Sequence, residues 1–129
     1  MQDINSIKSS VRISKLIPTL YTLKIEETIE FYVQILGFTC ETYNSDLGWA
    51  NLSFGHIELN LSIPIIDLQN EIVRGTNSFY FITEDVEMFW ETVKEKAKVC
   101  YPIEDFQYGM REFAIYDNLG NLLQFGRQL

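Results

Sequence analysis

The chain has 129 residues, 47% hydrophobic and 22% charged, which is enough to form one globular domain with its own core. Its net charge of -8 argues against a nucleic-acid-binding surface, which needs clustered Lys and Arg, and suits a cationic ligand. There is no apolar run of membrane-spanning length (about 18 residues) and no apolar export signal at the start, so we expect a cytoplasmic protein whose Cys40 and Cys100 are reduced.

The first half of the chain predicts a strand, a helix and three further strands. Residues 1–12 are polar and mixed, and are expected to form a peripheral arm. Residues 13–23 have the composition of a strand, but Pro18 lacks an N–H and predicts an edge, kinked or shared strand. Residues 25–36 carry apolar side chains at helical spacing, and Gly37 is suited to ending that helix. Three strands are predicted next, at residues 38–43, 48–54 and 56–63.

The strand at residues 56–63 alternates strictly between apolar and polar side chains. Ile57 and Leu59 therefore face one way, while Glu58 and Asn60 face the other. A helix packed on the apolar face would leave Glu58 and Asn60 on an open face.

The second half repeats the order of the first. After a connection at residues 64–75, we expect a strand at 78–83 and a helix at 85–98 with one apolar face. Three strands complete the chain, at residues 99–103, 111–116 and 122–125. The repeat is one of pattern only, since the two halves share little residue identity. It predicts two βαβββ modules, at about residues 13–63 and 76–127.

Two stretches carry a resemblance to a known family. LIPTLYTLKIEETIEFYVQILGF, with its Phe-Tyr and Leu-Gly-Phe, and the ending YGMREFAIYDNLGNLLQFG are similar to the first and last segments of the glyoxalase / bleomycin resistance / extradiol dioxygenase (vicinal oxygen chelate) superfamily. The match covers about residues 13–127 and looks closest to the bleomycin-resistance branch. Two turn details depart from the family pattern: Lys24-Ile25 before the first helix and Asn118 in place of a proline.

The resemblance implies an α+β fold in which two βαβββ modules form curled mixed sheets around a cavity. A single domain would then cover residues 13–129 after the arm at 1–12. Family members are commonly homodimers, and some exchange modules or first strands. Pro18 fits such an exchange.

The resemblance also implies where a metal would bind. Enzymes of the family hold one divalent transition metal at four positions, which fall here at Ile17, Glu58, Ser78 and Gln124. Only Glu58 and Gln124 can coordinate well, and His56, two residues before Glu58, is the one nearby substitute. We therefore predict no metal, no other cofactor and no catalytic residue. The alternative is a metal-dependent lyase, isomerase or dioxygenase that uses Glu58, Gln124 and His56.

The expected function is a metal-free protein that sequesters a small aromatic or cationic molecule, with antibiotic resistance as a possible role. Arg111 has two interpretations, a polar anchor for the ligand or a salt-bridge partner. We expect Glu58 to accept hydrogen bonds from Asn60, Gln124 or water, or to act as a base with a raised pKa. The candidate ligand-binding residues are Tyr21, Trp49, Glu58, Asn60, Tyr80, Tyr108, Arg111 and Gln124.

Overall fold

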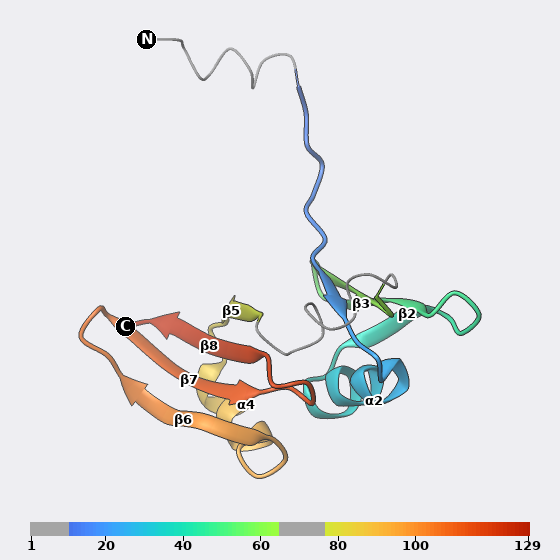
Figure 1. Ribbon diagram of the computed structural model, residues 1–129. Helices are drawn as coiled ribbons and strands as arrows, with labels where there is room; N and C mark the ends of the chain where they lie inside the picture. Colours follow the sequence, from blue (N-terminus) through green and yellow to red (C-terminus); the bar gives the residue numbers. More distant parts are fainter. Residues whose placement is uncertain (1–10, 65–76) are drawn as a thin grey trace.

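The computed structural model describes residues 11–64 and 77–129, which form two modules of the same design (Figure 1). The first module contains β1 (Thr19–Tyr21), α2 (Ile25–Glu30), the π-helix η1 (Phe31–Ile35), β2 (Thr39–Asn44), β3 (Trp49–Phe54) and β4 (Ile57–Ser62). The second contains β5 (Ser78–Ile82), α4 (Val86–Val93), β6 (Lys98–Asp105), β7 (Met110–Tyr116) and β8 (Leu122–Gln128). Most of the expected arm and of the connection between the modules lies outside the described residues.

Each module has a four-stranded mixed sheet. The strand orders are β1-β4-β3-β2 and β5-β8-β7-β6, so the same topology occurs twice. The first strand of each module is parallel to its neighbour, and the remaining pairs are antiparallel. The predicted α+β fold with two βαβββ modules is confirmed.

The core lies between each sheet and the helix of its module. Leu59 and Leu61 of β4 are buried there, as are Phe113 of β7 and Phe125 of β8. Each fully buried side chain of this size contributes about 1.5–3 kcal/mol. Because side chains alternate along a strand, the polar residues between them lie on the opposite face. In the described part of the chain, no helix combines the length and apolar character needed to cross a membrane.

Several elements differ from their predicted bounds. The first strand is only Thr19–Tyr21, and residues 11–18 leave the sheet as an extended segment (Figure 1). Pro18 marks this departure, because it has no N–H to continue the ladder. The first helix changes to π-helical geometry at Phe31, and α4 ends at Val93, so β6 already begins at Lys98.

Two side-chain hydrogen bonds join the two modules, and the first of them is buried. The Tyr32 hydroxyl, on η1, donates to Asp117 Oδ2 at 2.7 Å, in the turn between β7 and β8. The Asn118 side-chain amide donates to Thr28 Oγ1 at 3.0 Å. Asp117 also accepts hydrogen bonds from the backbone N–H groups of Leu119 and Asn121, which fix the turn. The closing turn of the second module is thus attached to the helix of the first.

Candidate functional site

A cavity of about 370 Å³ lies between the two modules, and we refer to it as the inter-module cavity. Glu58 of β4 and Tyr80 of β5 are the lining residues that carry a polar side-chain group. β1 pairs only with residues 60–62 of β4, and the unpaired beginning of β4 lines the cavity together with the edge strand β5. Its other lining residues are apolar: Pro18, Phe38, Ile57, Leu59, Phe79, Phe81 and Ile82.

The Glu58 carboxylate is held by groups of the first module. It pairs with the Lys15 ammonium and accepts a hydrogen bond from Asn51 Nδ2 at 3.3 Å, and the same amide nitrogen donates to Asn60 Oδ1 at 2.9 Å. Hydrogen bonds from Lys15 and Asn51 lower the pKa of Glu58. The expectations of a raised pKa and of Asn60 or Gln124 as donors were therefore wrong, because Lys15 and Asn51 reach the carboxylate instead.

The second sheet carries a buried carboxylate that the sequence reasoning missed. Glu112 of β7 is fully buried, and its Oε1 accepts a hydrogen bond from the Tyr80 hydroxyl at 2.6 Å. Its Oε2 accepts a hydrogen bond from the Tyr101 hydroxyl, to which Gln124 Nε2 donates at 2.9 Å. Burial acts to raise the pKa of Glu112, but hydrogen bonds from Tyr101 and Tyr80 outweigh it, so the pKa lies below its ordinary value.

Gly126 of β8 makes room for this arrangement. A Cβ atom at this position would collide with the Tyr80 hydroxyl and would lie 3.0 Å from Glu112 Cβ. The missing side chain therefore lets the Tyr80 ring lie across β8 and reach the carboxylate on β7. Burial and the hydrogen bond to Glu112 both raise the pKa of Tyr80 above its ordinary value.

The topology and this two-module site point to one family, and sequence comparison decides it. Residues 14–125 match the family model of the glyoxalase/bleomycin resistance protein/dioxygenase superfamily. The chain belongs to this superfamily.

Solved structures of the superfamily's fold resemble the chain over most of its length. TioX from Micromonospora sp. ML1 is 18% identical, with a TM-score of 0.75 and coverage of 91% of this chain and 100% of that one. The bleomycin-binding protein from Streptomyces verticillus, in complex with copper(II)-bleomycin, is 23% identical, with a TM-score of 0.70 and coverage of 89% and 96%. An integron cassette protein from V. cholerae is 25% identical, with a TM-score of 0.69 and coverage of 91% and 97%. No curated protein sequence matches.

The residues present do not fit the metal site of the superfamily's enzymes. Among residues 11–64 and 77–129, no three His, Cys, Asp or Glu side chains gather closely enough to hold a metal ion. Glu58, in the first sheet, already accepts hydrogen bonds from two partners. Gln124 is in the second sheet, where its side-chain N–H donates to Tyr101. His56 lies exposed in the turn before β4.

Arg111 lies on the opposite face of the second sheet from Glu112, since the two are neighbours on one strand. Its Nε donates to Asp105 Oδ1 at 2.7 Å and its Nη1 to Glu87 Oε2 of α4 at 2.7 Å. These contacts agree with the second interpretation, in which Arg111 is a salt-bridge partner. The alternation of β7 turns this side chain toward α4, and its role as a ligand anchor stays a prediction.

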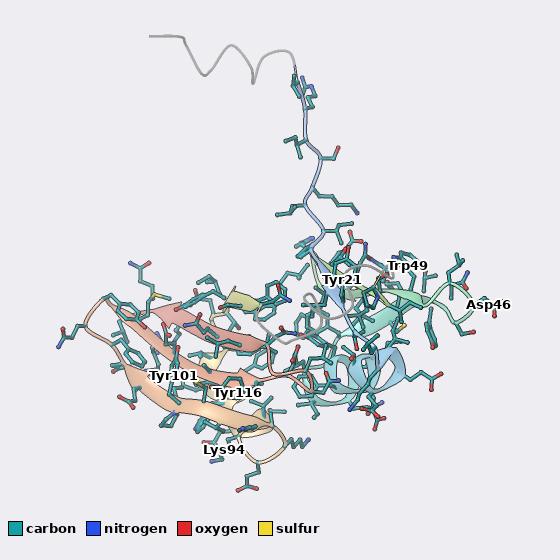
Figure 2. All side chains as sticks on the ribbon, viewed as in Figure 1. Tyr21, Asp46, Trp49, Lys94, Tyr101 and Tyr116 are labelled. Carbon is teal, nitrogen blue, oxygen red and sulfur yellow. The ribbon has the colours of Figure 1, made fainter. Side chains whose placement is uncertain are left out.

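The remaining candidates lie on both modules. Tyr21 and Trp49 belong to the first sheet, and Tyr101, which was not among the candidates, belongs to the second (Figure 2). Tyr108 lies in the loop between β6 and β7, is 64% exposed, and stacks on Phe106 with ring centroids 5.4 Å apart. The structure thus brings Glu58 and Tyr80 to one cavity and links Tyr80 to Gln124 through hydrogen bonds, while Glu58 and Gln124 stay on separate sheets.

Proposed function

We propose that this protein binds a small aromatic or cationic organic molecule in the inter-module cavity and holds it without chemical change. The observation that carries the proposal is the pairing of Glu58 with the Lys15 ammonium beside a cavity that is otherwise apolar and aromatic. A carboxylate next to aromatic rings is the combination that recognises an organic cation. Tyr80, whose hydroxyl is bound to Glu112, lines the cavity on the side of the second module.

In this proposal Lys15 occupies the place of the ligand's cationic group. Its side chain is 61% exposed and belongs to the extended segment before β1, so the ion pair is only partly shielded from water. Exposed pairs of this kind contribute about 0–1 kcal/mol. A ligand cation can therefore displace Lys15 at little cost, and its aromatic part would lie on the apolar wall.

We also propose that binding needs no metal or other cofactor. The support is the lack of a coordinating cluster in the described residues, the engagement of the Glu58 carboxylate with Lys15 and Asn51, and the position of Gln124 on the other sheet. The alternative, a metal-dependent enzyme, requires Glu58, Gln124 and His56 to converge on one ion. Elemental analysis of protein purified without chelators distinguishes the two, since a full equivalent of transition metal per chain would establish the alternative.

We further propose a cytoplasmic homodimer, with a role in antibiotic resistance as one possible use of the binding. The extended segment exposes Ile13 and Leu16, each 86% accessible, which a second copy could cover. Cys40 and Cys100 are free thiols, as a reducing compartment permits. Sedimentation of the full chain and of a variant with Ile13 and Leu16 both changed to Ser tests the dimer.

Calorimetric titration tests the binding proposal, with acridine orange and metal-free bleomycin as cationic aromatic probes. Glu58→Gln should weaken binding at least fivefold, and Lys15→Met should strengthen it up to about fivefold by removing the competing ammonium. Glu26→Gln, which changes an exposed carboxylate on α2, is the matched control and should bind like the wild type. Absence of binding by both probes, or equal affinity of wild type and Glu58→Gln, would overturn the proposal.

A further inference from the structure

Five phenylalanine rings form a closed circuit between the modules. Consecutive rings are in contact, with centroid separations of 5.4, 6.0, 5.0, 4.8 and 6.4 Å around the circuit. In order, the rings are Phe38, Phe54, Phe89, Phe125 and Phe81. The first two belong to the first module and the other three to the second, so the circuit exists only when the modules pack together.

These five rings line one cavity of about 290 Å³, which we call the phenylalanine pocket. Phe38 and Phe125 are 5% and 2% exposed and form its floor. Phe54 and Ile82 are 39% and 67% exposed and form its rim, so the pocket opens to solvent. It shares a wall with the inter-module cavity, but Glu58 and Tyr80 do not line it.

The chemistry of the lining defines what the pocket accepts. His56 and Thr83 are its polar side chains, and its other described lining residues are apolar. A water molecule is poorly stabilised in this pocket, because an ordered water molecule needs two to four polar partners. A flat apolar molecule would instead contact rings on several sides and recover dispersion energy that an empty pocket lacks.

We propose that the phenylalanine pocket is a second binding site, for an uncharged aromatic molecule of one or two rings with a single hydroxyl or similar polar group. The volume lies at the lower end of the range for small-molecule pockets, about 300–1,000 Å³, which limits the occupant to this size. The aromatic part lies among the five rings, and its polar group bonds to His56 or Thr83 at the side. The site goes beyond the proposed function, since its ligand carries no cation and makes no contact with Glu58.

Titration of the labelled full-length protein with 2-naphthol, followed by NMR, tests this site. The Thr83 methyl and His56 ring resonances should shift, because these residues line the phenylalanine pocket and not the inter-module cavity. Phe54→Ala should weaken 2-naphthol binding about tenfold by removing one ring of the circuit. Glu58→Gln is the matched control and should leave this affinity unchanged while it weakens binding of acridine orange.

A second variant tests the site if Phe54→Ala does not fold. Ile82→Glu puts a charge at the exposed rim and should also weaken 2-naphthol binding at least tenfold. The proposal is overturned if 2-naphthol causes no shift at millimolar concentration, or if Glu58→Gln weakens its binding and the rim variants do not. It is also overturned if sedimentation shows a dimer that Ile82→Glu dissociates, because a second copy would then cover the pocket.

Discussion

Replacing Tyr32 by phenylalanine tests the junction between the modules, because it removes one hydroxyl and leaves the ring. That hydroxyl lies 2.7 Å from Asp117 Oδ2, with Tyr32 0% and Asp117 6% exposed. A hydrogen bond to a charged group is worth about 1.5–3 kcal/mol, and water has no access here to replace the donor. Tyr32→Phe should therefore lower the free energy of unfolding by about 2 kcal/mol and the melting temperature by roughly 6–10 °C.

Urea denaturation gives this free energy, and the chain provides a matched control. Tyr43 also donates to a carboxylate, Glu26 Oε1, but at 3.2 Å and on the surface. Tyr43→Phe should therefore lower the free energy of unfolding by less than about 0.5 kcal/mol. A double-mutant cycle of Tyr32→Phe with Asp117→Asn should give a coupling energy of about 1–2 kcal/mol. A loss in Tyr32→Phe no larger than in Tyr43→Phe would refute the reasoning.

Three further predictions concern the second module. The lowered pKa of Glu112 means that its stabilising contribution is complete above its ordinary pKa of 4.5 and is lost as the pH falls through the folded value. Glu112→Gln should therefore be less stable at neutral pH and lose less further stability on acidification, as measured by urea midpoints at several pH values. Gly126→Ala should displace the Tyr80 hydroxyl and cost about 1 kcal/mol, and adding Tyr80→Phe should restore part of this loss in thermal melts. An NMR titration should give Glu87 a pKa of about 2, since hydrogen bonds from Arg127 and Arg111 lower it, and Arg127→Gln should move that pKa toward 4.5.

Periodicity predicted which way most of the candidate side chains face. Strict alternation in the strand before Pro64 predicted that Glu58 and the buried Leu59 lie on different faces of the sheet, and the structure confirms this. The same rule applied to the strand that opens with Arg111 would have turned Glu112 away from the helix. Glu112 was not predicted as a site residue, because the polar group of that strand was taken to be Arg111, its first residue as predicted.

Contacts between distant segments could not be read from the sequence. Glu58 and Lys15 are separated by 43 positions, and the extended segment that brings Lys15 to the carboxylate follows no periodic pattern. The phenylalanine circuit was equally hidden, because each ring looks like ordinary core packing within its own module. Neighbouring side chains along a strand are set by local geometry, whereas these contacts depend on how the modules pack.

The absence of a side chain at Gly126 has a consequence for evolution. Because a methyl group there would occupy the space of the Tyr80 hydroxyl, the two positions are not free to change independently. In a family alignment, relatives that carry alanine or a larger residue in place of Gly126 should carry phenylalanine or a shorter side chain in place of Tyr80. The same relatives should lack the acid corresponding to Glu112 more often, since a buried carboxylate without the Tyr80 hydroxyl keeps only the Tyr101 hydroxyl of its two tyrosine donors.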